Sequence, residues 1–192
     1  MHCDVAFSRP APSFRRYTMR IHRWKRYTWD LTKLPEYESK LPSHFNVRTA
    51  TREEEKAVLL TISSAFKLDT AWADSFKIVT SFIEAQIAAG FLQRSLPCLV
   101  ITHGVRIIAA SALNTTEEAP SNLITGPCVL AEYRSRGLGT ALLHESLLHL
   151  KATGLQHASG ICKENLPAGR FVYPKFGSAS YDFDLEALTA TT

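Results

Sequence analysis

The segment Glu132–Leu143, EYRSRGLGTALL, places two arginines and two glycines directly before a run of helix-forming residues. Glycine lets the backbone turn tightly and approach a ligand without a Cβ in the way. The first N–H groups of the following helix have no partner within that helix, and the helix dipole adds partial positive charge there. Arg134, Arg136 and the hydroxyl of Thr140 would strengthen such a site. The segment therefore predicts an anion site, and phosphate is the anion usually bound at such a helix start.

The two best-known phosphate motifs do not describe this segment. No Gly-Lys-Ser/Thr follows the glycines as in a P-loop, and the G-x-G-x-x-G of a dinucleotide fold is incomplete. Taken alone, the pattern fits an ordinary strand-to-helix turn with surface arginines equally well. The surrounding elements must therefore decide between these interpretations.

The hydrophobic pattern predicts an α/β (α+β) domain with a mainly antiparallel sheet and one parallel βαβ crossover. Partial alternation indicates one or two short strands within residues 17–31, and β-rich runs predict strands at 45–50, 97–102, 106–113, 122–130, 155–163 and 178–188. Helices are expected over 51 to about 66, 69 to about 89, 138 to about 153, and 165–177. Thr51 with Glu54 forms a capping box, Asp69 and Asn165 are expected N-caps, and Gly90 is expected to end the second helix.

In this context the sequence resembles the GNAT superfamily of acyl-CoA-dependent N-acyltransferases. Residues 134–139, Arg-Ser-Arg-Gly-Leu-Gly, match that family's Gln/Arg-x-x-Gly-x-Gly/Ala phosphate loop. The family's second motif, an Asn, a small residue and then Tyr-x-Lys-x-Gly, is matched by Asn165, Ala168, Tyr173, Lys175 and Gly177. The resemblance runs from about residue 45 to residue 183. It implies a mixed sheet of six to seven strands, flanked by about four helices and splayed at two central parallel strands.

The resemblance also implies acetyl-CoA, or another acyl-CoA, as cofactor. Its pantetheine arm would lie between the splayed strands Gly126–Leu130 and His157–Cys162 and bind backbone groups of Val129 and Leu130. Its pyrophosphate would bind the N–H groups of residues 136–140. The implied phosphate-binding residues are Arg134, Ser135, Arg136, Gly137, Leu138, Gly139 and Thr140.

Asn165 and Tyr173 each have two interpretations. Asn165 either bonds the cofactor arm or caps its helix. Tyr173 matches the family's general acid, which would protonate the departing thiolate, and a phenol has a pKa near that of an alkyl thiol. The alternative for Tyr173 is a packed aromatic on an amphipathic helix.

The sequence does not identify the general base that takes the proton of the attacking amine. Two polar residues, Asn122 and Thr125, lie on the strand that leads to Val129. The other candidates are a water relay or one of Glu84, His103, His157 and Glu164. No metal is expected to take part.

Only fifteen residues follow Gly177, which is short for the two strands that the family places there. Either one of these strands is missing or the N-terminal segment replaces it. We divide the chain into a basic arm and linker over residues 1–43 and a GNAT-like domain over residues 44–192. Residues 1–16 are expected to be dispensable, whereas the alternating aromatics of residues 17–31 are expected to pack on the domain.

The net charge of +4 is concentrated in the N-terminal segment, because residues 1–29 hold seven Lys/Arg and one Asp. Basic residues interleaved with aromatics can suit single-stranded nucleic acid, but a solvated arm is favoured here. The four cysteines form no CxxC pair, which argues against a zinc site and fits a reducing compartment. Neither a membrane-spanning run nor a secretory signal is found. We therefore expect a cytoplasmic protein.

These observations favour an N-acetyltransferase that moves an acetyl group from acetyl-CoA to a primary amine by direct transfer. The alternative is a non-catalytic acyl-CoA-binding or regulatory protein with the same fold. The expected partners are an acyl-CoA and an amine, without membrane or nucleic acid. The acceptor and a homodimeric state are left open.

Overall fold

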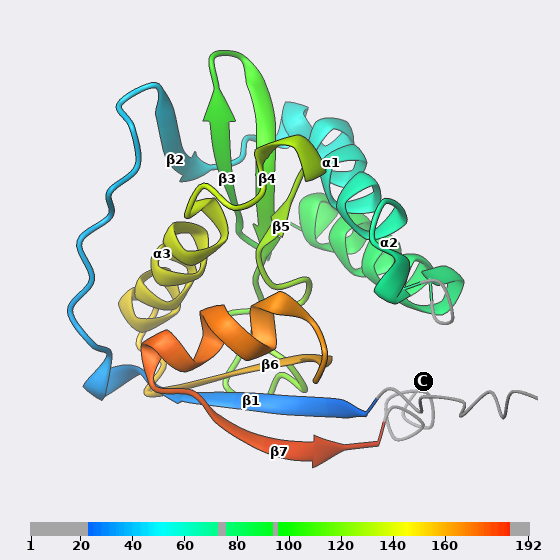
Figure 1. Ribbon diagram of the computed structural model, residues 1–192. Coiled ribbons are helices and arrows are strands. Elements are labelled where there is room, and N and C mark those ends of the chain that lie inside the picture. Colours follow the sequence, from blue (N-terminus) through cyan, green and yellow to red (C-terminus); the bar gives the residue numbers. More distant parts are fainter. Residues whose placement is uncertain (1–22, 73–75, 94–95, 185–192) are drawn as a thin grey trace, which may run out of the picture.

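The computed structural model describes residues 23–72, 76–93 and 96–184, and in these residues the chain forms two sheets (Figure 1). A three-stranded sheet has the order β6-β1-β7, and a four-stranded sheet has the order β2-β3-β4-β5. The strands are β1 (Trp24–Asp30), β2 (Phe45–Thr49), β3 (Cys98–His103), β4 (Arg106–Ala112), β5 (Cys128–Val129), β6 (His157–Lys163) and β7 (Ala179–Phe183). This mixed, mainly antiparallel architecture confirms the expected fold class.

Within the described residues, three α-helices and a pair of tight helical turns cover the sheets. The helices are α1 (Glu55–Lys67), α2 (Phe76–Gln93) and α3 (Leu138–Ala152). Figure 1 shows α3 on one side of the four-stranded sheet and α1 and α2 on the other. The π-helical turn η5 (Ala168–Val172) and the 3₁₀ turn η6 (Tyr173–Phe176) follow β6. None of the helices in the described part of the chain is long and apolar enough to cross a membrane.

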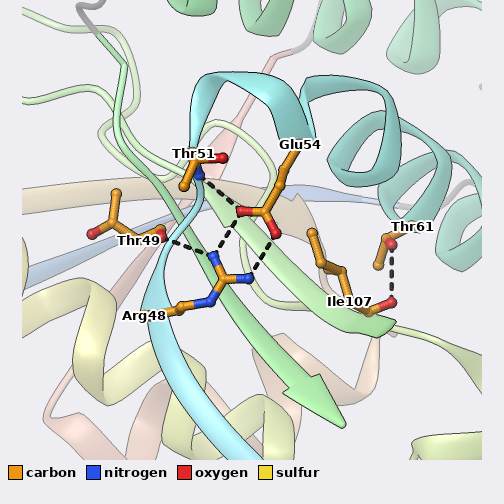
Figure 2. Close-up of polar contacts among 6 residues, drawn as sticks. All are labelled: Arg48, Thr49, Thr51, Glu54, Thr61 and Ile107. Atoms are coloured by element: carbon orange, nitrogen blue, oxygen red, sulfur yellow. Dashed lines mark hydrogen bonds and ion pairs between the residues drawn. The ribbon is translucent and has the colours of Figure 1, made fainter. Parts of the chain in front are cut away.

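The start of α1 is fixed by charge and capping (Figure 2). Thr51 precedes the 3₁₀ turn η2 (Arg52–Glu54), and its N–H donates to Glu54 Oε2 at 2.8 Å. Both carboxylate oxygens of Glu54 accept from the Arg48 guanidinium, at 2.6 and 2.7 Å. This pairing lowers the pKa of Glu54 to about 2. Within the helix, the Thr61 hydroxyl lies 3.3 Å from Ile107 O and so links α1 to β4.

The two sheets touch at one point and then diverge. Leu123 forms an antiparallel bridge to Leu113 and a parallel bridge to Gly160. Farther along the chain, β5 pairs with β4, whereas β6 pairs with β1. Gly126 has φ +62°, and Pro127 has no N–H to donate. These two residues therefore interrupt the predicted strand 122–130, of which only β5 is a regular strand.

The N-terminal strand β1 lies in the middle of its sheet, antiparallel to both neighbours. Tyr27 is opposite Gly160 of β6 and Ser180 of β7. Tyr27, Trp29 and Leu31 are buried at alternate positions, as the aromatic alternation predicts. The sequence left two alternatives open, a missing strand or a strand supplied by the N-terminal segment. The structure shows the second, because β1 is part of the sheet.

Among the predicted element boundaries, those placed at Gly90 and Asn165 are wrong. Gly90 lies inside α2 rather than after its end. A Cβ at this position would come within 3 Å of the Leu96 side chain, so glycine serves close packing there instead of a helix stop. The helix predicted over 165–177 begins only at Ala168, with Pro167 at the N-cap, so Asn165 is not its cap.

The position of β1 leads to a prediction about truncation. Deleting residues 1–16 should leave the melting temperature unchanged, because these residues show neither a motif nor core periodicity. Deleting residues 1–31 should abolish cooperative unfolding, because it removes the central strand and its buried aromatics. Circular dichroism melting of both truncations tests this, with the shorter deletion as control. A long truncation that melts like the full chain would contradict the structural role of β1.

Candidate active site

A cleft of about 360 Å³ lies where the two sheets diverge. Its walls come from β5, from β6 and from the turns η5 and η6, and the start of α3 closes one end. Residues of α1 and of the 3₁₀ turn η3 (Thr70–Trp72) also line it. α1 and α3 lie on opposite faces of the four-stranded sheet (Figure 1), and residues of both helices line the cleft.

The glycine segment forms the expected helix start at one end of this cleft. Ser135 and Gly137 have φ of 61° and 78°, which turns the chain sharply into α3. The first intrahelical bond runs from Ala141 N–H to Gly137 O at 3.0 Å. The N–H groups of residues 138–140 therefore precede the helical ladder and are the donors left for a ligand. Ser135, Gly137, Leu138, Gly139 and Thr140 all line the cleft.

Arg134 lines the cleft, and its guanidinium is engaged with other parts of the protein. Its Nε donates to Val129 O at 3.2 Å. One terminal nitrogen donates to Ala65 O at 2.9 Å, and the other pairs with Asp69 at 3.2 Å. Since Ala65 lies in the last turn of α1, the guanidinium satisfies a carbonyl at the negative end of that helix. Arg134 thus ties α1 and Asp69 to the loop before α3, and its role at phosphate stays a prediction.

Arg136 lies outside the cleft lining. Its guanidinium is over the ring of Tyr133, 5.4 Å from the centroid, and donates to Glu132 O at 3.2 Å. It therefore adds positive charge near the loop, while its side chain does not form a wall of the site.

Val129 and Leu130, which were expected to bind pantetheine, differ in the backbone groups that are left for a ligand. Leu130 N–H donates to Ile108 O at 3.0 Å, and Leu130 O accepts from Tyr133 N–H at 2.9 Å. Both backbone groups of Leu130 therefore have partners within the protein, and its contact with pantetheine stays a prediction. Since backbone groups alternate along a strand, those of Val129 point away from β4 into the gap. Val129 O accepts from Arg134, which leaves the Val129 N–H as the donor facing the cleft.

Tyr173 lies at the gap with only 2% of its surface exposed. Its ring makes edge contacts with Tyr27 and Trp29, at centroid distances of 4.9 and 5.1 Å. Its hydroxyl points toward Gly126, where an added Cβ would lie 2.5 Å from the phenol oxygen. Gly126 therefore leaves the space that the hydroxyl needs at the start of β5.

Burial controls the ionisation of the groups around the cleft. Desolvation raises the pKa of Tyr173 well above its ordinary value, so the phenol keeps its proton at neutral pH. Burial also raises the pKa of the Cys128 and Cys162 thiols to about 12. Both thiols line the cleft but are protonated, which makes them poor nucleophiles.

Several polar candidates named from the sequence lie outside the cleft lining, among them Asn165, His103, His157 and Glu164. Asn165 is exposed. Asn122 is buried and holds the chain together, because its amide donates to Asn114 O and Thr116 O, both at 3.1 Å. Thr125 does line the cleft, and its hydroxyl accepts from Ala112 N–H at 3.1 Å.

The wall formed by α1 and η3 was not predicted from the sequence. Phe66 and Trp72 pack edge to face with ring centroids 4.7 Å apart, and both line the cleft. Lys163 holds η3 to the end of β6, because its Nζ donates to Ala71 O at 2.8 Å. Asp69 is the only carboxylate among the described lining residues. The spacing of the aromatic residues predicted a helix face in this region. Which of these residues lie near the cleft depends on the tertiary fold.

A family model for the acetyltransferase (GNAT) family matches residues 62–177, which is more than half of the chain. The chain therefore belongs to the GNAT acetyltransferase family. The matched range contains the phosphate loop, both diverging strands and Tyr173.

Solved structures share the fold at low sequence identity. A GCN5-related N-acetyltransferase from Sphaerobacter thermophilus is 18% identical, with TM-score 0.55, over 84% of this chain and 49% of that chain. The corresponding protein from Kribbella flavida is 16% identical, with TM-score 0.54, over 84% and 56%. A Drosophila protein is 14% identical, with TM-score 0.56, over 83% and 48%. The chain thus spans about half the length of these structures. No curated protein matches the sequence.

The different settings of the two arginines predict different effects on stability. Arg134→Ala should lower the free energy of unfolding by about 1–3 kcal/mol, because it leaves the carbonyl at the end of α1 and Asp69 without their partner. Arg136→Ala should change it by less than about 0.5 kcal/mol, as expected for an exposed site. Urea denaturation of both variants measures the difference. Equal losses from the two substitutions would contradict the structural role of Arg134.

Proposed function

We propose that this protein is an N-acetyltransferase that transfers the acetyl group of acetyl-CoA to a primary amine. The observation that carries the proposal is that one cleft is lined both by the start of α3, whose first N–H groups are suited to an anion, and by a buried phenol that keeps its proton. These are the two chemical requirements of thioester transfer from a phosphorylated carrier. The free, buried cysteines fit a reducing compartment, and we propose a cytoplasmic location.

The proposed path of acetyl-CoA follows the cleft. The pyrophosphate accepts hydrogen bonds from the N–H groups of residues 138–140, where the dipole of α3 favours negative charge. The pantetheine arm then lies in the gap between β5 and β6, where the Val129 N–H is its donor on one wall. This direction brings the thioester toward Tyr173.

The acceptor enters from the face of α1 and η3 in this proposal, opposite the face of α3. The amine nitrogen attacks the thioester carbonyl, the C–N bond forms, and the C–S bond breaks. The Tyr173 hydroxyl donates its proton to the departing thiolate. The amine releases its proton to water or to Asp69, the one carboxylate among the described lining residues, and the bulk solvent restores the phenol proton.

Direct transfer is favoured over an acyl-cysteine intermediate. A covalent route would need a thiolate, and both thiols at the cleft have their pKa raised to about 12 by burial. A non-catalytic acyl-CoA-binding protein remains the second candidate. The placement of Tyr173 in the cleft favours the enzyme, because binding alone does not require a proton donor there.

The cofactor site is tested at Gly139, a helical residue with room for a small side chain. A Cβ there would meet Val129 Cγ2 at 3.7 Å, an ordinary contact. Gly139→Ala should therefore bind acetyl-CoA within a few-fold of wild type. Gly139→Val should lose at least about tenfold in affinity, because its branched side chain crowds the phosphate position. Gly137 is unsuitable for this test because its φ of 78° strains any other residue.

Calorimetric titration of both Gly139 variants with acetyl-CoA provides the measurement, after melting curves establish that they are folded. Equal affinity of Gly139→Val and Gly139→Ala would remove the assignment of the phosphate site.

The general acid is tested by Tyr173→Phe, which keeps the ring contacts and removes the proton donor. General acid catalysis contributes about 10²- to 10⁴-fold, so kcat should fall by that factor while the affinity for acetyl-CoA stays within a few-fold. Steady-state kinetics with an amine panel, following thiol release, gives both values. A variant that keeps wild-type kcat while the chemical step is rate-limiting would show that Tyr173 only packs.

A further inference from the structure

The ring of Tyr173 contacts two aromatic rings from a segment outside the predicted acyltransferase domain. Two residues of β1, Tyr27 and Trp29, contact this ring edge to face, at interplanar angles of 76° and 77°. Tyr27 is 5% and Trp29 is 1% exposed. Figure 1 shows β1 passing beneath the turns η5 and η6, which carry Tyr173.

The position of β1 makes this contact rigid. The strand pairs with β6 along its length and with β7 on its other edge. Its pairing with β6 extends past both ends, through Glu164 N–H to Arg23 O at 3.0 Å and Leu31 N–H to Gln156 O at 2.8 Å. An aromatic ring on a central, doubly paired strand has little freedom to move away from its neighbour.

The turn that carries Tyr173 is fitted to the same strand. Gly169 lies against the Tyr27 phenol, and a Cβ at this position would come within 3 Å of the Tyr27 ring. The glycine thus allows η5 to approach β1 closely. At the other end of Tyr173, the hydroxyl points toward Gly126. The ring therefore contacts β1 at its sides, and a side chain at Gly126 would collide with its hydroxyl.

We propose that Tyr27 and Trp29 are positioning residues that fix the orientation of the Tyr173 hydroxyl toward the thioester. The inference rests on the proposed function, in which Tyr173 protonates the thiolate. It makes the N-terminal strand part of the active site, so residues 44–192 do not form the complete catalytic unit. General acid catalysis depends on hydrogen-bond geometry, and a displacement of about 1 Å can cost about 10²-fold in rate.

The matched test compares two substitutions at one position. Tyr27→Phe keeps the ring that touches Tyr173, and its kcat should stay within about threefold of wild type. Tyr27→Leu removes the ring, and its kcat should fall about 10- to 100-fold while KM for acetyl-CoA changes little. Trp29→Leu should lower kcat in the same way, and it replaces Tyr27→Leu in the test if that variant does not fold. Leu31→Ala removes an equally buried side chain of the same segment without a ring contact to Tyr173, and it should leave kcat near wild type.

A double-mutant cycle distinguishes positioning from general destabilisation. In the Tyr173→Phe background no hydroxyl remains to be oriented, so Tyr27→Leu should lower kcat no further. An equal loss in both backgrounds, or an equal loss from Leu31→Ala, would overturn the proposal. If Tyr173→Phe alone leaves kcat unchanged, Tyr173 is not the general acid. This result differs from the results that overturn the positioning role of Tyr27 and Trp29, so the two hypotheses are tested separately.

A spectroscopic measurement tests the positioning without turnover. In protein with ¹³C-labelled tyrosine rings, the signal of Tyr173 is identified by its loss in Tyr173→Phe. We expect this signal to keep its position in Tyr27→Phe and Leu31→Ala, and to shift and broaden in Tyr27→Leu. A signal unchanged in Tyr27→Leu would show that β1 does not hold the ring.

Discussion

The divergence of two neighbouring strands is the constraint on which the rest of the structure depends. Leu123 bridges to Gly160, and beyond this point β5 and β6 pair with different partners. In the gap, no strand lies between the backbone of Val129 and the facing edge of β6. Unpaired backbone groups within a protein require a partner, and an extended amide-containing ligand can supply it. The cleft is therefore a consequence of how the sheet is divided.

Two cationic side chains hold the far wall of the cleft in place. Arg134, which follows β5, reaches Ala65 O and Asp69. Lys163, at the end of β6, reaches Ala71 O. The corner between α1 and η3 is thus attached to both diverging strands, and it presents Phe66 and Trp72 to the cleft. These two charged side chains therefore help to shape the cleft.

Local signals allowed most of the elements and the phosphate loop to be predicted from the sequence. The glycine segment, the Thr51–Glu54 pair and the alternation of Tyr27 and Trp29 each act within a few residues. Contacts with distant partners could not be predicted. The hydrogen bonds of Arg134 to Ala65 and Asp69 span more than sixty positions of the chain. The bond of Leu130 N–H to Ile108 depends on the register with β4, which cannot be derived from neighbouring residues.

The central claim is that acetyl-CoA lies in the gap, with its phosphates at the start of α3 and its arm along β5. Amide hydrogen exchange with and without acetyl-CoA tests this most directly, because it reports on individual N–H groups. The account predicts added protection at residues 138–140 and at Val129, and no change at Leu130, whose N–H is already bonded to Ile108. Binding of acetyl-CoA without added protection at these four amides would contradict it.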